Sequence, residues 1–199
     1  MQCFGILLVD IILIINPFAP IKYKKISTLE NYMIHISHFV SPIGDILLEA
    51  EDNALCGLWF IGQRNFPKRY ENIIYSDTEP QIIKDSKAWL KAYFAGEQPQ
   101  ISVLSLNPTG TKFQKQVWDI LRRIPYGKTI SYGEIAAMLE KMLGRKMSAQ
   151  AVGGAVGHNP ISIIIPCHRV IGAKGSLTGY AAGLERKIAL LELEKASAL

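Results

Sequence analysis

Residues 131–160 read "SYGEIAAMLEKMLGRKMSAQAVGGAVGHNP" and predict how the second half of the chain folds. Ser131 and Glu134 have the spacing of a capping box, so we expect a helix that begins there and ends at Gly144. Ser148 can cap a second helix, which Pro160 stops. Two short helices joined by a tight loop are typical of a helix-turn-helix.

The second of these helices has an almost bare surface. Its small residues are Ala149, Ala151, Gly153, Gly154 and Ala155. Two adjacent glycines cost a helix roughly 1 to 2 kcal/mol relative to alanines, so we expect something to approach this backbone closely. Two candidates remain open for the approaching group: a neighbouring helix or strand of the same chain, or a DNA groove.

Local signals upstream predict the rest of an α/β fold. Thr111 and Gln114 form another capping box, and the Pro/Gly-rich segment 105–110 marks an expected domain boundary. Period-two runs predict an antiparallel meander of three strands, at 34–40, 45–50 and 54–60. A helix within 79–96 is expected to cover the sheet with one face, made by Ile82, Ile83, Ser86, Trp89, Leu90, Tyr93 and Phe94. This gives a small N-terminal α/β domain over 33–106 and a helical C-terminal domain over 107–199.

Residues 1–32 form a hydrophobic N-terminal extension whose status stays open. Its apolar run at 4–15 is shorter than a membrane span, and it lacks the basic start and the cleavage site of a signal peptide. Two interpretations remain: Met33 is the native start, or the extension is an extra strand or a hydrophobic arm.

The charge is divided unevenly between the two halves. Residues 1–106 carry 9 Lys/Arg and 11 Asp/Glu, a net charge of −2, whereas residues 107–199 carry 13 and 6, a net charge of +7. A basic second half is typical of a polyanion binder, although many small basic domains touch no nucleic acid. The three cysteines are too few and too scattered for a disulfide framework, so we expect a reduced, cytosolic protein.

Residues 163–172, "IIIPCHRVIG", place a thiol, an imidazole and a guanidinium side by side at the expected end of a buried apolar strand. Pro166 interrupts that strand, and His168 and Arg169 can stabilise a thiolate, so we favour a nucleophilic Cys167 over a structural thiol. Neighbours on an extended strand point to opposite faces. His168 can therefore activate the thiol only if the chain bends or a water bridges the two groups.

With these motifs the chain resembles the O6-alkylguanine-DNA alkyltransferases, the methylated-DNA–protein-cysteine methyltransferases. The resemblance runs from about Met33 to Glu194 and rests on "SPIG", "GTKFQKQVW", "IPYGKTISYGEIA" and "AVGGAVGHNPISIIIPCHRVIGAKGSLTGYAAGLERK". It implies a ribonuclease H-like N-terminal domain and a winged-helix-like C-terminal domain. It also implies a reaction in which the protein flips O6-alkylguanine out of duplex DNA and moves the alkyl group irreversibly to its own cysteine.

The resemblance assigns roles to single residues. Cys167 would be the nucleophile, His168 would deprotonate it through a water, and Glu194 would orient His168. Tyr132 would donate a hydrogen bond to the flipped guanine, and Asn159 would brace the turn around the site.

Other assignments concern the walls of the site and the DNA. Arg169 would tie its segment down, and the loop 176–183 would wall the pocket with Tyr180 and the amide of Ala181. The DNA groove would receive the helix surface formed by Gln150, Ala151, Gly153 and Gly154. Taken alone, Glu194 and Tyr132 would have been assigned to a solvated helix end and to the core.

This chain departs from the family pattern at two places. Many members carry an arginine that fills the hole left by the flipped base, and here that position is Gln150, which supplies no cation. Some members bind a structural zinc in the first domain, but no Cys/His set is expected here. The resemblance implies no cofactor, no membrane association and a monomer that binds double-stranded DNA. Whether O4-methylthymine is also a substrate is not decided by the sequence.

Two functions from other classes compete with this reading. A DNA-binding module without chemistry would lack the cysteine, which is present as Cys167. A cysteine hydrolase would need an oxyanion site and repeated turnover, and it would leave the +7 charge of the second half without a role.

Overall fold

The computed structural model describes residues 34–68 and 79–196. The two interpretations of residues 1–32 fall outside these ranges. Three strands form an antiparallel sheet in the order β1 (Ile34–Ser41), β2 (Gly44–Glu51) and β3 (Ala54–Phe60). The meander predicted from the sequence is therefore confirmed, with each end within one residue.

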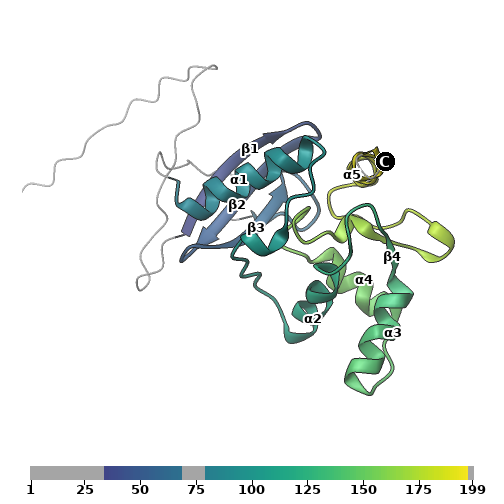
Figure 1. Ribbon diagram of the computed structural model, residues 1–199. Coiled ribbons are helices and arrows are strands. Elements are labelled where there is room, and N and C mark those ends of the chain that lie inside the picture. Colours follow the sequence, from purple (N-terminus) through teal and green to yellow (C-terminus); the bar gives the residue numbers. More distant parts are fainter. Residues whose placement is uncertain (1–33, 69–78, 197–199) are drawn as a thin grey trace, which may run out of the picture.

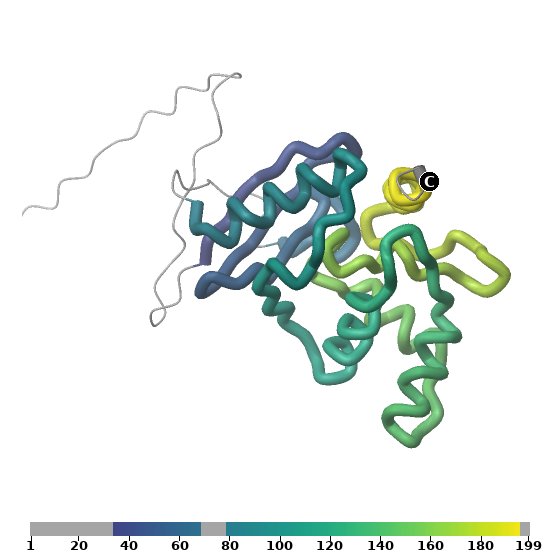
Figure 2. The backbone as a smooth tube through the Cα atoms, viewed as in Figure 1, coloured from purple at the N-terminus to yellow at the C-terminus, as the bar shows by residue number. Residues whose placement is uncertain are grey.

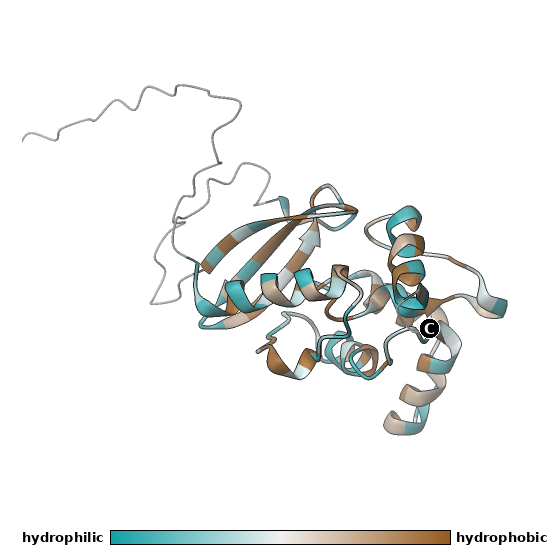
Figure 3. Cartoon of the chain, turned by 45° about the horizontal axis from the view of Figure 1, so that its top comes forward, coloured by the Kyte–Doolittle hydropathy of each residue, from teal (hydrophilic) through white to brown (hydrophobic). Residues whose placement is uncertain are grey.

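The helix α1 (Gln81–Phe94) lies across this sheet (Figure 1). Its buried residues are those of the predicted face: Ile82, Ile83, Ser86, Trp89, Leu90 and Tyr93. Hydrophilic residues lie between them, as the mixed colouring of the helix in Figure 3 shows. Burial of this apolar face, rather than helix propensity, holds α1 on the sheet.

The helical half contains α2 (Lys112–Leu121), α3 (Tyr132–Leu143), α4 (Ala149–Gly157) and α5 (Leu184–Ala196). Both predicted capping boxes are present, and the Ser148 hydroxyl accepts a hydrogen bond from the amide of Ala151 at 3.1 Å. Gly144 ends α3 with φ of 65°, a left-handed conformation that glycine adopts without strain. The predicted helix-turn-helix is thus formed by α3 and α4.

One continuous hydrophobic core joins the sheet and the helices. Trp118 of α2 is fully buried, and its indole nitrogen donates to the carbonyl of Ala155 in α4 at 2.9 Å. Gly110 lies so close that an added Cβ would come within 2.4 Å of the Trp118 ring. The glycine at position 110 therefore allows the chain just before α2 to lie against this ring.

The edge of β3 that is not paired with β2 anchors the chain that leads to Cys167. The amide of Leu58 donates to the carbonyl of Pro160 at 2.7 Å, and the amide of Ser162 donates back to the carbonyl of Leu58 at 2.8 Å. In Figure 2 the green segment after α4 passes beside the sheet. The residues before the thiol are thus fixed to the N-terminal sheet.

The prediction of an apolar strand before Pro166 is wrong. Residues 162–164 form a turn, and Ile163 has φ of 68°, which is rare for a β-branched residue. After the turn, η3 (Cys167–Arg169) is a short 3-10 helix, followed by β5 (Val170–Ile171), which pairs with β4 (Ile130–Ser131). Only one bridge, between Leu58 and Ile161, remains of the expected strand. The adjacent thiol and imidazole therefore lie on a bend of the chain.

Candidate active site

Asn159 organises the turn that presents Cys167. Its side-chain oxygen accepts a hydrogen bond from the amide of Ile161 at 3.1 Å. Its side-chain nitrogen lies 2.8 Å from the carbonyl of Ile165 and 3.1 Å from the Cys167 sulfur. These hydrogen bonds replace the ladder that a strand would provide, and they account for the strained turn.

The Cys167 thiol is protonated at rest. Its side chain is only 4% exposed, and burial raises its pKa to about 11, against the opposing effect of the Asn159 hydrogen bond. The sequence predicted that neighbouring cations would stabilise a thiolate. In the structure they do not, because the Arg169 guanidinium pairs with Glu194 instead.

His168 and Glu194 form a fully buried pair. The His168 Nε2 lies 2.7 Å from Oε1 of Glu194. Burial lowers the pKa of His168 although Glu194 opposes this shift, so the imidazole is neutral. We infer that Nε2 carries the proton and donates a hydrogen bond to the carboxylate of Glu194. Nδ1 is then the basic nitrogen, and it has no hydrogen-bond partner within 34–68 and 79–196.

Glu194 is held by donors from several elements. Arg169 donates from Nε and from a terminal nitrogen, both at 2.9 Å, and the amide of Gly127 donates at 3.0 Å. The hydroxyl of Tyr93 in α1 donates at 2.8 Å. Burial alone would raise the pKa of Glu194, but His168 and Arg169 outweigh it and lower the pKa to about 2. The carboxylate is therefore ionised and fixed.

The loop 176–183 lies over this region. Tyr132, at the start of α3, directs its hydroxyl toward the carbonyl of Gly179 at 3.1 Å. Tyr180 is buried, and its pKa lies well above the usual range. The larger cause is its burial, and the smaller is the nearby Cys167. Burial and then Cys167 also raise the pKa of Tyr132. The structure thus brings both tyrosines close to Cys167.

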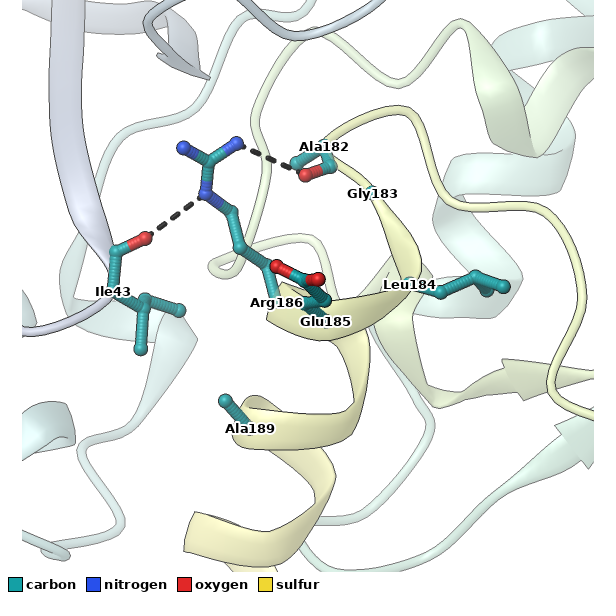
Figure 4. Close-up of a pocket in the computed structure, with 7 residues that line it drawn as sticks. All are labelled: Ile43, Ala182, Gly183, Leu184, Glu185, Arg186 and Ala189. Atoms are coloured by element: carbon teal, nitrogen blue, oxygen red, sulfur yellow. Dashed lines mark hydrogen bonds between the residues drawn. The ribbon is translucent and has the colours of Figure 1, made fainter.

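The described part of the protein has two hollows that bear on the site. The larger, of about 740 Å³, lies between Ile43 and the start of α5 (Figure 4). Its lining includes Ala182 and Gly183 of the loop 176–183, but none of Cys167, His168, Glu194 and Tyr132. The smaller, of about 520 Å³, is lined by Tyr132, Gln150, Gly153, Gly179 and others. Some of these residues are ones that the resemblance assigns to the base and the DNA, so the smaller hollow is hereafter called the base pocket; Cys167 is not among the residues that line it.

Known proteins match the whole of the described fold. The family model for the ribonuclease-like domain of 6-O-methylguanine DNA methyltransferase matches residues 34–108, and that for its DNA binding domain matches residues 112–196. The methylated-DNA–protein-cysteine methyltransferase of Mycobacterium tuberculosis is 47% identical over 166 residues, which cover 83% of this chain and 95% of the relative. The chain belongs to this family.

Other members show the same similarity. The methylated-DNA–protein-cysteine methyltransferase of Methanosarcina acetivorans is 47% identical over 159 residues, covering 78% of this chain and 95% of the relative. The crystal structure of the M. tuberculosis O6-methylguanine methyltransferase shares 44% identity and a TM-score of 0.69, covering 84% of this chain and 96% of that one. A second M. tuberculosis structure, in complex with DNA, also gives a TM-score of 0.69, at 44% identity and with 82% and 94% covered.

The small-residue face of α4 is open in this methyltransferase. Gln150, Ala151 and Gly154 are exposed, and an added Cβ on Gly154 would meet nothing within 4 Å. Gly153 has only the Tyr132 ring near it, at an ordinary contact distance of 3.8 Å. Of the two candidates for a close neighbour, helices of the chain approach part of this surface: Trp118 of α2 bonds to the carbonyl of Ala155, and the Tyr132 ring of α3 lies beside Gly153. Gln150, Ala151 and Gly154 stay exposed in the described part of the chain.

Two residues that support the methyltransferase site were missed by sequence reasoning. Tyr93 was expected only as a core residue of α1, and its hydroxyl gave no signal of a partner 101 residues away. Lys187 is fully buried, and its ammonium donates to the carbonyls of Val170 at 2.6 Å and Thr178 at 2.8 Å. Burial lowers its pKa. The available signal was the helical spacing that places Lys187 on the same face of the expected helix as Leu184, Leu190 and Leu191.

The carbonyl of Ala181 accepts a hydrogen bond from the amide of Arg64 at 2.9 Å, so this residue ties its loop to the N-terminal half.

No group of three or more His, Cys, Asp or Glu that could hold a metal lies within the described ranges. Among the same residues, no helix is long and apolar enough to cross a membrane.

Proposed function

We propose that this methyltransferase repairs DNA by moving the alkyl group of O6-alkylguanine to its own Cys167, once per molecule. The observation that carries the proposal is the buried Cys167 thiol next in sequence to His168, which pairs with the ionised Glu194. Cys167 also lies close enough to Tyr132, which lines the base pocket, to raise the pKa of that phenol. The names of its relatives, which are methylated-DNA–protein-cysteine methyltransferases, support the same reaction.

The first step is removal of the thiol proton. Because the pKa of Cys167 is raised to about 11, the thiol needs a base at the moment of attack. His168 is neutral and its Nδ1 is free of protein partners in the described region, so it accepts the proton through a bridging water. Glu194 then stabilises the imidazolium that forms.

The second step is displacement at carbon. The Cys167 sulfur forms a bond to the alkyl carbon while the bond from that carbon to O6 breaks, and the electron pair stays on guanine. Guanine leaves as its N1 anion, or as neutral guanine once it takes up a proton. Tyr132 can assist by donating to the base, for which its hydroxyl must exchange the carbonyl of Gly179 for the base.

The reaction ends with S-alkylcysteine. A thioether is a poor electrophile, and the reaction consumes the Cys167 thiol, so the site is not regenerated. Asn159 and Arg169 support the nucleophile and the carboxylate but do not react. The protein needs no cofactor for this chemistry.

DNA binding follows from the charge and from α4. The net charge of +7 over residues 107–199 favours phosphates, and the open face at Gln150, Ala151 and Gly154 is slim enough for a groove. The complex of the M. tuberculosis protein with DNA supports this proposal. We expect the protein to act as a monomer in the cytoplasm.

Stoichiometry and mass spectrometry test the reaction. Incubation with an excess of duplex DNA carrying O6-methylguanine should add the mass of one methylene group to the Cys167 peptide, with one lesion repaired per molecule. Cys167→Ala should abolish transfer and keep DNA binding. Cys56→Ala is the matched control, because Cys56 lies in β3 and should not matter. Repeated turnover would indicate a hydrolase, and a methyl group on another residue would refute the role of Cys167.

A further inference from the structure

The loop that follows β3 is held in a fixed conformation. The side chain of Gln63 is buried and accepts a hydrogen bond from the amide of Phe60 at 3.0 Å. The amide of Gln63 donates to the carbonyl of Phe60 at 3.1 Å, and the amide of Phe66 donates to the carbonyl of Gln63 at 3.1 Å. The residues between them, Arg64 and Asn65, are therefore presented from a rigid turn.

This turn reaches both sides of the base pocket. The amide of Arg64 donates to the carbonyl of Ala181, in the loop that covers the site. The side chain of Asn65 donates to the carbonyl of Gly157, at the end of α4, at 3.0 Å. Asn65 has φ of 65°, a conformation that asparagine tolerates better than most residues. The N-terminal domain thus touches the two elements between which a flipped nucleotide would enter.

The side chain of Arg64 lines the base pocket together with Tyr132 and Gln150. It is the one charged residue among the described residues that line it. The arginine is exposed and forms no ion pair with the described residues. Its charge reaches Tyr132, where it opposes the larger effect of burial on the pKa of the phenol. An exposed arginine without an ion pair among the described residues therefore lines a pocket whose lining contains no acidic residue.

We propose that Arg64 binds a DNA phosphate next to the extruded nucleotide, so that the N-terminal domain supplies the cation that Gln150 does not. This inference rests on the proposed function. A guanidinium has five donors and no acceptor, which suits a phosphate in one or two hydrogen bonds. Because the turn is pinned before DNA arrives, little ordering of the backbone is needed when Arg64 engages.

Phosphate binding predicts a specific change in salt dependence. Each neutralised phosphate of B-DNA contributes about 0.9 to the slope of log affinity against log salt concentration. Arg64→Gln should make that slope shallower by about 0.9 and slow transfer from duplex DNA at subsaturating concentration, whereas Arg64→Lys should keep the slope. Transfer from free O6-methylguanine base should be unchanged in Arg64→Gln, since the base carries no phosphate.

Lys91→Gln is the matched control. Lys91 is exposed on α1 and its substitution removes the same unit charge from the same domain, away from the base pocket. The control should retain the wild-type slope. All variants should unfold at the wild-type temperature, because neither side chain makes a hydrogen bond in the described part of the protein.

The outcomes separate this proposal from the proposed function. An unchanged slope in Arg64→Gln, or an equal change in Lys91→Gln, would overturn the phosphate contact. Equal slowing with DNA and with free base would place Arg64 on the base and overturn it too. If the wild-type protein itself transferred no methyl group to Cys167, the proposed function would fail instead.

Discussion

Oε1 of Glu194 accepts a hydrogen bond from the hydroxyl of Tyr93 at 2.8 Å, although 101 residues separate the two in sequence. Tyr93 lies in α1 of the N-terminal sheet domain, and Glu194 lies near the end of α5. The same oxygen faces Nε2 of His168. The N-terminal domain is therefore part of the proposed catalytic machinery, beyond its role as a support for the helices.

Tyr93→Phe tests this connection. The substitution removes one donor from a buried carboxylate, which should destabilise the fold by about 1 to 3 kcal/mol and slow transfer several-fold. The measurement is chemical denaturation together with single-turnover transfer. Tyr126→Phe is the control, because the buried Tyr126 hydroxyl has no hydrogen-bond partner among the described residues and its loss should change neither quantity. Equal behaviour of the two variants would argue against a role for the Tyr93 hydroxyl.

The free energy of unfolding should decrease in acid, because Glu194 is ionised in the folded protein and must then be protonated. Its folded-state pKa is about 2, below its ordinary value of 4.5, so its contribution is complete above pH 4.5 and is lost as the pH falls toward 2. The shift corresponds to about 3 kcal/mol. The lowered pKa of His168 acts in the same direction below pH 6.5, since the unfolded chain binds a proton that the folded chain does not.

Denaturation of Glu194→Gln as a function of pH checks this prediction. The variant should be less stable than the wild type at neutral pH and should lose less stability between pH 4.5 and 2. Glu192→Gln is the matched control on the same helix, because Glu192 is exposed. A steep acid loss that survives in Glu194→Gln would mean that other carboxylates cause it.

Arg186 connects the two halves of the protein beside the larger hollow (Figure 4). Its Nε donates to the carbonyl of Ile43 at 2.9 Å and a terminal nitrogen donates to the carbonyl of Ala182 at 3.0 Å. The guanidinium also lies 4.8 Å from the centre of the Phe60 ring. Arg186→Met should therefore destabilise the protein by about 1 to 3 kcal/mol in denaturation experiments.

Arg123→Met provides the comparison for Arg186. Arg123 is exposed and makes no side-chain hydrogen bond or ion pair within 34–68 and 79–196, so its loss should have almost no effect on stability. If both variants lost the same stability, removal of charge rather than the connection between Ile43 and Ala182 would be responsible.

Local signals in the sequence were sufficient for most of the fold. The capping boxes at Thr111 and Ser131 and the helix cap at Ser148 act over a few residues, and each was found where the pattern indicates. The resemblance supplied what such signals cannot, because nothing local distinguishes Glu194 from a solvated helix residue.

The missed features depend on partners far away in sequence. Residues 161–165 look like a buried strand because an apolar run has no period that separates a strand from a buried turn. Their backbone is satisfied instead by the Asn159 side chain and by the edge of β3. The same reason hid Tyr93 and the resting thiol of Cys167, since burial and hydrogen bonding appear only once the domains are packed.

Gln150 should act as a weak substitute for an arginine in base flipping. Flipping costs roughly a few kcal/mol, and a side chain that fills the vacated stack recovers part of it. Gln150 is exposed on α4 and lines the base pocket, so it lies where such a side chain would enter.

Gln150→Ala should slow transfer from duplex DNA more than from single strands, and Gln150→Arg should be neutral or faster, in single-turnover measurements with both substrates. Ser148 and Ala149 stay in place as the helix start, so the fold should not change. If Gln150→Ala slowed both substrates equally, the side chain would have no part in flipping.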